Sequence, residues 1–417
     1  MTPRFPSTVV ERFLRYVQVD TRSDDGSTTC PSTPGQWDLL QMLEREMLAL
    51  GLQDVTLDDN GYLFGTVPAT PGATAPVIGF VAHVDTSPEV SGQGVRPLVH
   101  RAYDGGDLVL PMWPAAPLSP ASSPRLLKYV GGDIITTSGD TLLGADDKAG
   151  VAEIMAAAEV LMAHPEIPHG PIRIGFTPDE EIGRGAHLFD VERFGAAFAY
   201  TLDGGPRGEL ECESFSADAI TFVFHGAITH PGYARGRMIN AIKVAAAFID
   251  SLPVHGLSPE TTSGREGFVH PYRIDAAVDV TRVSLLLRDF DTEQLDAHAR
   301  TLTNLAESAT QRWPGSRFEV VRTQQYRNMR EVVDQHPHIM ELARRAYHAS
   351  GVEPHESAIR GGTDGSQLSF KGLPCPNLFA GQQNIHSRFE WIACDDLHKA
   401  VEVIVNIAAL AASELAG

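Results

Sequence analysis

Apolar and polar residues alternate along the chain with two periods, one typical of helices and one typical of strands. Helix signals, with apolar residues three and four positions apart, fall at 8–19, 34–50, 149–162, 239–251, 292–311, 338–349 and 397–415. Strand signals fall at 55–57, 63–66, 77–84, 171–177, 198–203, 221–224, 276–288 and 378–380. The first two helices each follow a capping-box pattern, at Thr8 and at Thr33.

The order of these signals predicts one α/β domain interrupted by a second domain. Segment 77–84 is almost wholly apolar, as expected of a strand buried on both faces of a sheet. From about residue 215 the pattern changes to a β-α-β-β-α block, which ends near residue 328. We therefore expect a first domain made of 1–214 and 329–417 with an inserted α+β domain at 215–328. Residues 87–132, rich in Pro and Gly, predict an irregular excursion.

The composition and the net charge of the chain exclude several classes of function. The chain has 417 residues, and 53 acidic against 33 basic residues give a net charge of −20. This balance argues against a nucleic-acid or anionic-membrane partner, because either requires a basic face. No apolar stretch reaches the length of a membrane span, and no secretory signal is visible at the N-terminus. The four cysteines form no CxxC pair. We expect a cytoplasmic protein.

The candidate functional residues are histidines and acidic residues at the ends of predicted strands. His83 and Asp85 follow the most apolar strand, and residues two apart on a strand share a face, so the two side chains can meet. A carboxylate beside a histidine orients the ring of a metal ligand. The alternative is a turn that happens to contain two polar residues.

Two further acidic groups occupy equivalent places. Asp146 and Asp147 precede an Ala-rich helix, where simple N-capping is the alternative explanation. Asp179, Glu180 and Glu181 follow another apolar strand. Three consecutive acids repel one another unless they are fully solvated or face a cation. With a cation present, one carboxylate serves as a ligand and its neighbour as general base.

Asp203 ends a further strand, and His386 lies in a loop near the C-terminus. No single one of these motifs decides the function, but the set does. Two histidines with three carboxylates form a ligand set for two divalent ions when one carboxylate bridges them. This donor set suits zinc, manganese and cobalt alike.

With these motifs the sequence resembles a known family, the co-catalytic zinc metallopeptidases, which include aminoacylases and succinyl-diaminopimelate desuccinylase. The resemblance covers essentially the whole chain and is closest to the branch of tripeptide aminopeptidases. The segments that carry it are Thr141–Lys148, Phe176–Glu181, Ala199–Gly205, Gly264–Gly267, Ile359–Gly365 and Gly372–Leu378. It implies a phosphorylase/hydrolase-like α/β catalytic domain with a mixed sheet, and an inserted α+β ferredoxin-like lid.

The resemblance also implies roles for individual residues. One Zn²⁺ would be held by His83, Asp146 and Asp203, and a second by His386, Asp146 and Glu181. Asp85 would orient His83, Glu180 would be the general base, and the Asp146–Asp147 peptide bond would be cis. Substrate contacts would come from His230 as a donor to the anionic intermediate, from Arg288 and Arg360 to the substrate carboxylate, and from Asn240 and Asp179.

The expected reaction is release of the N-terminal residue from tripeptides. A related dipeptidase, carboxypeptidase or N-acyl-amino-acid deacylase is the alternative. The family usually has a Tyr-Asn-Tyr-His-Gly segment before the metal histidine, whereas this chain has Gln382-Gln383-Asn384-Ile385 before His386 and Ser387 after it. From this departure we expect a changed loop geometry and a changed substrate preference. The oligomeric state stays open, with a homodimer as one candidate.

Overall fold

The computed structural model describes residue 5 and residues 7–415. The chain divides into two compact units. Unit 1 comprises residues up to 212 with 331–357 and 363–417, and unit 2 comprises 213–330 with 358–362. The segment expected from the sequence to form the inserted domain was 215–328. Unit 2 also includes the short return segment 358–362, whose contribution the sequence pattern does not reveal.

Unit 1 is built around a mixed sheet of eight strands in the order β1-β2-β6-β3-β7-β14-β8-β13. The strands are β1 Gln53–Leu57, β2 Leu63–Val67, β3 Ile78–His83, β6 Ile172–Thr177, β7 Phe198–Gly204, β8 Glu209–Ser214, β13 His355–Ile359 and β14 Asn377–Phe379. Strand β3 pairs in parallel with both β6 and β7, and β7 pairs in parallel with β14. Strands β1, β2 and β8 pair antiparallel with their neighbours β2, β6 and β14. This is the α/β fold with a mixed sheet that we expected.

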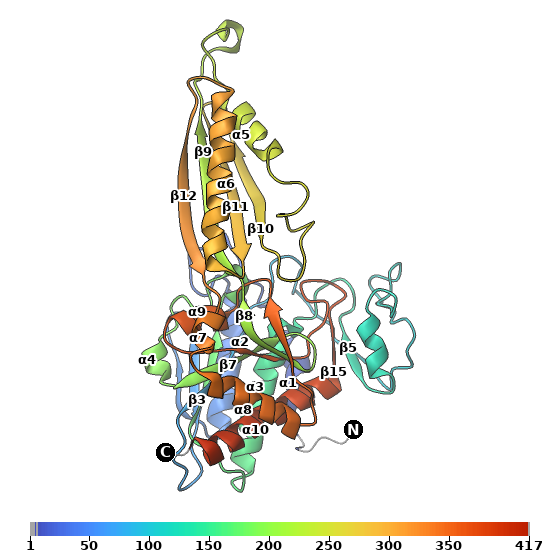
Figure 1. Cartoon of the computed structure of the whole chain (residues 1–417). Helices are drawn as coiled ribbons and strands as arrows, with labels where there is room; N and C mark the ends of the chain where they lie inside the picture. The colour runs from blue at the N-terminus through green and yellow to red at the C-terminus, as the bar shows by residue number, and fades with distance from the viewer. Residues whose placement is uncertain (1–4, 6, 416–417) are drawn as a thin grey trace. The chain divides into compact units, whose positions relative to one another are not determined.

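Helices pack against this sheet (Figure 1). They are α1 Val9–Tyr16, α2 Pro34–Leu50, α3 Ala145–Ala163, α4 Val191–Phe194, α7 Arg330–Val333, α8 Pro337–Ala349, α9 Asp364–Phe370 and α10 Cys394–Glu414. Helix α3 lies directly on the central strands, and Gly150 permits this approach. A Cβ at this position would lie 2.1 Å from the carbonyl oxygen of Leu202 in β7. The start of α3 is thereby brought to the carboxyl ends of the parallel strands.

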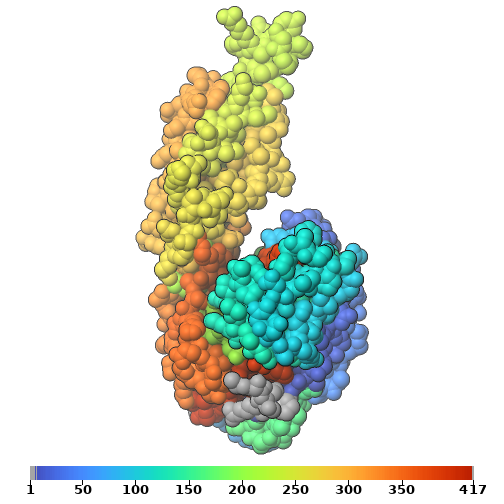
Figure 2. Space-filling view, turned by 90° about the vertical axis from the view of Figure 1, so that its right-hand side faces the viewer, coloured from blue at the N-terminus to red at the C-terminus, as the bar shows by residue number. Residues whose placement is uncertain are grey.

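The excursion after β3 contains little regular structure, as its composition predicts. Strand β4 Leu98–His100 joins β5 Ile134–Thr136 and β15 Trp391–Ala393 in a small sheet, and η1 Pro124–Tyr129 is a single 3₁₀ segment. A cluster of buried side chains that includes Leu126, Ile134 and Trp391 connects the excursion to the C-terminal part of unit 1. Figure 2 shows the excursion in cyan at the surface.

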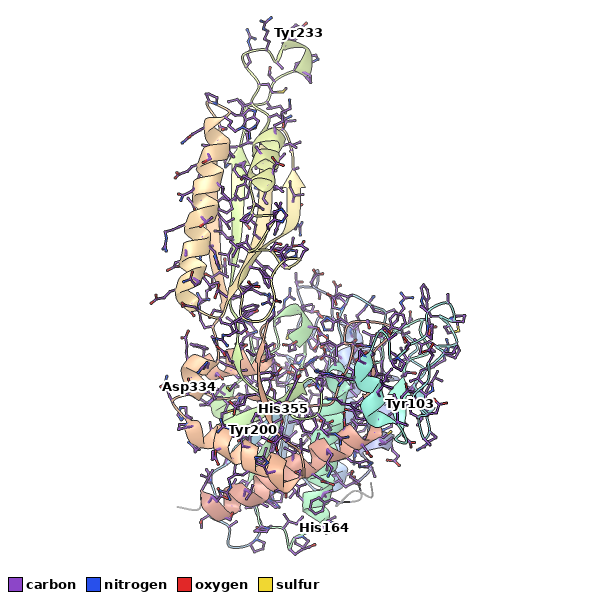
Figure 3. The ribbon with its side chains drawn as sticks, turned by 45° about the vertical axis from the view of Figure 1, so that its right-hand side comes forward. Tyr103, His164, Tyr200, Tyr233, Asp334 and His355 are labelled. Atoms are coloured by element: carbon purple, nitrogen blue, oxygen red, sulfur yellow. The ribbon has the colours of Figure 1, made fainter. Side chains whose placement is uncertain are left out.

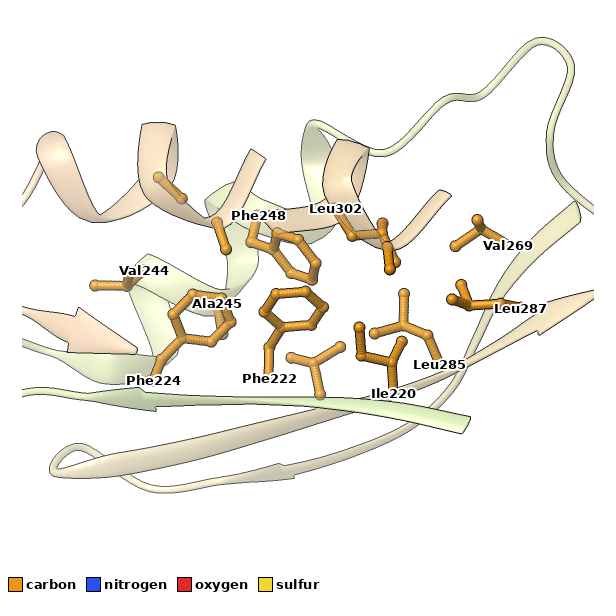
Figure 4. Close-up of a cluster of buried hydrophobic side chains, with 14 of the residues drawn as sticks. Ile220, Phe222, Phe224, Val244, Ala245, Phe248, Val269, Leu285, Leu287 and Leu302 are labelled. Carbon is orange, nitrogen blue, oxygen red and sulfur yellow. The ribbon is translucent and has the colours of Figure 1, made fainter. Parts of the chain in front are cut away.

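Unit 2 has the β-α-β-β-α-β order of a ferredoxin-like fold. Its elements are β9 Ser216–His225, η3 Pro231–Tyr233, α5 Ala241–Asp250, β10 Phe268–Ala276, β11 Val280–Asp289, α6 Thr292–Gln311 and β12 Arg317–Tyr326. The strands form an antiparallel sheet in the order β10-β11-β9-β12. Phe222 and Phe224 of β9, Leu285 of β11 and Phe248 of α5 fill the space between the sheet and the helices (Figure 4).

The capping predictions at Thr8 and Thr33 were wrong. Thr8 makes no capping hydrogen bond to its helix; its hydroxyl donates to Glu159 at 2.5 Å and accepts from Nε of Arg12 at 2.8 Å. Thr33 makes none either. Strand β12 was missed because most of its side chains are exposed, so it carries no apolar alternation. Within the described residues, no helix is long and apolar enough to cross a membrane.

Candidate metal centre

Five side chains from four elements and one loop of unit 1 converge at the carboxyl ends of the parallel strands. His83 is the last residue of β3, and Asp203 lies near the end of the adjacent strand β7. Glu181 lies in η2 Glu180–Ile182, just after β6. Asp146 lies at the start of α3, and His386 in the loop after β14. Ligand sites in open α/β sheets form at this edge, because loops from neighbouring strands meet there.

The five side chains form two groups that share one residue. In the first group, Nε2 of His83 lies 3.1 Å from Oδ1 of Asp146 and 3.7 Å from Oδ1 of Asp203. In the second, Nε2 of His386 lies 3.2 Å from Oδ2 of Asp146 and 2.9 Å from Oε2 of Glu181. The ligand atoms within each group all lie within 4.8 Å of one another. Each group is thus compact enough to surround one cation.

Asp146 is the shared residue, and its two oxygens face different groups. Oδ1 faces His83 and Oδ2 faces His386. A carboxylate in this orientation can bridge two divalent ions. The second oxygen of Glu181, Oε1, is buried and has no hydrogen-bond partner among the described residues. A buried oxygen without a donor is costly unless a cation satisfies it, so these residues fit a pair of metal ions.

The electrostatics of the groups also favour cations. Burial opposes a charge on His386, but the contacts with Asp146 and Glu181 outweigh burial and raise the pKa of His386 to about 11. Burial and the neighbouring Asp146 carboxylate raise the pKa of Glu181 to about 8, although the contacts with His386 and His83 act in the opposite direction. The same negative field that holds a proton here stabilises a divalent ion.

Asp85 contacts both His83 and the backbone of Glu180 and Glu181. Its Oδ1 lies 3.3 Å from Nδ1 of His83. The same oxygen accepts a hydrogen bond from the backbone N–H of Glu180 at 2.9 Å, and Oδ2 accepts one from the N–H of Glu181 at 3.1 Å. Asp85 is completely buried. It therefore holds the position of the His83 ring and of the Glu180–Glu181 backbone at the same time.

Glu390, for which the sequence predicted no role, supports the loop that presents Asp146. Gly144 has φ +81°, and the Asp146–Asp147 peptide bond is cis, as the family resemblance implied. The carboxylate of Glu390 accepts hydrogen bonds from the N–H groups of Leu143 at 2.7 Å, Gly144 at 2.8 Å and Asp146 at 3.0 Å. The only sequence signal for Glu390 was its spacing of four residues from His386.

The segment that departs from the family pattern also contacts the centre. Gln382 donates from Nε2 to the carbonyl oxygen of Asp203 at 3.1 Å, and its amide lies 3.4 Å from Oδ1 of the same residue. Gln383 pairs with Trp391 through two backbone hydrogen bonds of 3.1 Å. This chain therefore orients Asp203 with an amide from the altered segment.

Glu180 lies beside the two groups but belongs to neither. Burial raises the pKa of Glu180 well above its usual range, and the carboxylates of Asp203 and Asp364 act in the same direction. A carboxyl group with a raised pKa is suited to accept a proton and release it again near neutral pH. These properties match those required of a general base.

Asp179 is buried in a structural position. Its Oδ2 accepts a hydrogen bond from the N–H of Ser32 at 2.7 Å, and its Oδ1 accepts from the Ser32 hydroxyl at 2.5 Å and from Nε2 of Gln36 at 2.7 Å. Both oxygens are therefore occupied by the segment that begins α2. These bonds favour a structural role for Asp179 over the expected contact with a substrate amine.

The other four expected substrate contacts belong to unit 2, where the two arginines differ. Arg360 donates from Nη1 to the carbonyl oxygens of Gly264 at 2.7 Å and Glu266 at 2.8 Å, which fixes the loop around them. The Nε of Arg288 is buried and has no acceptor among the described residues. The Nε of Arg288 is therefore an unsatisfied donor. The Nη1 of Arg360, in contrast, is used in bonds to its own loop.

His230 and Asn240 each make one local contact. The N–H of Gly232 donates to Nδ1 of His230 at 3.1 Å, so a neutral His230 ring carries its proton on Nε2 and presents it as a donor. Asn240 caps α5 by accepting a hydrogen bond from the N–H of Ile242 at 2.9 Å.

Comparison with known proteins shows the family of this chain. Residues 142–410 match the model of Peptidase family M20/M25/M40. Peptidase T from Geobacillus kaustophilus is 52% identical over 96% of this chain and 97% of its own length. The crystal structure of aminopeptidase PepT from Bacillus cereus superposes with a TM-score of 0.74 and 26% identity, covering 97% of this chain and 98% of that one.

A more distant solved structure shares the fold. It is described as a dinuclear metal binding peptidase of the M20 family from Bacillus subtilis, with a TM-score of 0.64 and 14% identity, covering 96% of this chain and 97% of that one. The family match includes Asp146, Glu181, Asp203 and His386 but begins after His83, whereas the peptidase T relative from Geobacillus kaustophilus covers 96% of this chain. The chain therefore belongs to peptidase family M20/M25/M40 and is a hydrolytic aminopeptidase of its peptidase T branch.

Proposed function

We propose that this protein is a two-zinc aminopeptidase that releases the N-terminal residue from tripeptides. The observation that carries the proposal is the placement of Asp146, whose two oxygens face two separate His-carboxylate groups. The names of the peptidase T relatives and of a tripeptidase structure from Staphylococcus aureus support the reaction and the substrate class.

His83, Asp146 and Asp203 would hold one ion, and His386, Asp146 and Glu181 the other. When bound, two Zn²⁺ ions polarise a peptide carbonyl and lower the pKa of a bound water. The protein provides the orientation of the ligands: Asp85 fixes the ring of His83, and Glu390 fixes the backbone of Asp146.

Glu180 is the residue we assign to proton transfer. Its carboxylate accepts a proton from the attacking water and delivers it to the amine that leaves when the peptide bond breaks. Asp85 fixes the Glu180 backbone through the 2.9 Å hydrogen bond, so the base is held beside the metal groups. Burial keeps its pKa raised, which allows the same group to give the proton back.

The residues of unit 2 would bind the substrate ends and the developing oxyanion. The guanidinium of Arg288, whose Nε has no acceptor among the described residues, suits the C-terminal carboxylate of a peptide. His230 offers an N–H donor from Nε2 to the tetrahedral oxyanion. Asn240 remains a further proposed contact, through its amide NH₂, and Arg360 contributes by fixing the loop it bonds.

A peptide panel tests the reaction. Matched di-, tri- and tetrapeptides and N-acetylated tripeptides are incubated with the zinc-loaded enzyme, and the released amino acid is identified. We expect rapid release of the N-terminal residue from free tripeptides alone. Equal cleavage of the N-acetylated peptides would refute the aminopeptidase assignment and support the deacylase alternative. Release of the C-terminal residue would support a carboxypeptidase.

Substitution of Glu180 tests the mechanism. We expect Glu180→Gln to bind two zinc ions, measured by metal analysis, and to lose about 10²–10⁴-fold in kcat. The matched control is Glu192→Gln on an exposed helix of the same unit, which should leave kcat unchanged. Retention of wild-type kcat by Glu180→Gln would remove Glu180 as the base.

A further inference from the structure

The second histidine of the centre has a backbone conformation that needs support. His386 has φ +56°, and Asn384, two residues earlier, has φ +52°. Residues other than glycine are uncommon in this left-handed region, and surrounding contacts must hold them there. The contacts of the His386 ring and of its loop therefore determine whether Nε2 can serve as a ligand.

One such contact comes from Glu89, in the excursion that follows β3. Oε2 of Glu89 lies 2.7 Å from Nδ1 of His386. The hydroxyl of Ser87 donates to the same carboxylate oxygen at 3.1 Å and so fixes it. Glu89 belongs to neither metal-binding group.

The two ring nitrogens of His386 have separate partners. Nε2 faces Asp146 and Glu181, and Nδ1 faces Glu89. When Nε2 binds a metal, the remaining proton must be on Nδ1, which then donates to the Glu89 carboxylate. This is the arrangement that Asp85 provides for His83 on the other side of the centre.

A second contact from the excursion holds the same loop. The guanidinium of Arg388 lies 4.3 Å from the centre of the Trp113 ring, a cation–π distance. Arg388 is two residues beyond His386. The excursion thus contacts the loop both at the histidine ring and just beyond it.

We infer that Glu89 is a positioning residue for the second metal ion, because it fixes the tautomer and the ring orientation of His386. The inference rests on the proposed two-metal function. Glu89 acts through His386 and does not contact the metal. Since 65% of its side chain is exposed, its removal leaves the core intact.

The test is calorimetric titration of Zn²⁺ into the metal-free full-length protein. Removal of such an outer partner lowers metal affinity about 10–100-fold in other metal sites. We expect Glu89→Ala to weaken one of two binding events by about this factor and to leave the other unchanged. Glu89→Gln loses the charge but keeps an acceptor oxygen, so it should retain most of the affinity.

A matched control is the exposed pair formed by His164, just after α3 and labelled in Figure 3, with Glu166. Its Nδ1–Oε1 distance is 2.8 Å. Glu166→Ala should leave both binding events unchanged. Wild-type affinities for both ions in Glu89→Ala would overturn the inference, and so would equal losses in Glu89→Ala and Glu89→Gln, which would indicate a charge effect alone. Binding of fewer than two ions by the wild-type protein would instead overturn the proposed function.

Discussion

Glu153 provides the sharpest prediction about stability. It lies inside α3, is fully buried, and neither of its carboxylate oxygens has a hydrogen-bond partner among the described residues. Burial raises the pKa of Glu153 well above its ordinary value, and the nearby Asp396 carboxylate acts in the same direction. Folded Glu153 therefore keeps its proton to a higher pH than an exposed glutamate does.

The consequence is a dependence of stability on pH that one substitution removes. In the unfolded chain a glutamate loses its proton above a pH of about 4.3, whereas folded Glu153 keeps it. Unfolding then releases one proton, so the free energy of unfolding falls by about 1.4 kcal/mol for each pH unit. The fall continues until the pH reaches the raised pKa of the folded state. Glu153→Gln has the same shape and no proton to release.

The assay is urea denaturation of metal-free protein at pH 5.5, 6.5 and 7.5. The free energy of unfolding of Glu153→Gln minus that of the wild type should increase by about 1.4 kcal/mol per pH unit. All other groups cancel in this difference. The exposed control Glu192→Gln should give a difference that does not change with pH. A constant difference for Glu153→Gln as well would refute the protonated state of Glu153.

Three further predictions concern packing and the loop at the metal centre. Glu390→Ala removes the acceptor of three backbone N–H groups and should destabilise unit 1 by about 3 kcal/mol or more; hydrogen exchange of the Asp146 amide should accelerate, and unchanged protection would contradict this. Gly150→Ala places a Cβ 2.1 Å from a backbone oxygen of β7, so the urea midpoint should fall by the equivalent of about 1–3 kcal/mol; an unchanged midpoint would show that α3 can move away. Phe222→Ala leaves a cavity in the core of unit 2 and should lower the free energy of unfolding by about 3–5 kcal/mol, measured in the same assay. Substitution of the exposed Val321 by Ala should lower it by less than about 0.5 kcal/mol.

The sequence was sufficient where chemistry and local pattern coincide. The apolar run that became β3 predicted a strand buried on both faces, and all six of its residues are buried. Acidic residues and histidines at strand ends indicated the metal centre because the carboxyl ends of parallel strands meet at one edge of the sheet. The family resemblance added the division of these residues between two ions, and the structure assembles both groups.

Local patterns failed where long-range contacts decide the outcome. Thr8 has the residue type of a helix cap, but its hydroxyl bonds instead to Glu159, which lies in a helix distant in sequence, and to Arg12. Asp179 stands beside Glu180 and Glu181 in sequence, yet Ser32 and Gln36 donate hydrogen bonds to its two oxygens. Strand β12 shows no apolar alternation, because pairing with β9, and not burial, holds it in the sheet.

The sequence by itself thus indicated the class of fold and a set of residues able to bind two metal ions, because both depend on residue types in fixed local patterns, and the family resemblance added the kind of reaction. Only the tertiary structure decided which groups hold those residues in place. Glu390 lies 244 positions from the Asp146 backbone it supports, and Glu89 contacts His386 from a different loop. Such contacts depend on how distant segments pack, and no periodicity along the chain encodes them.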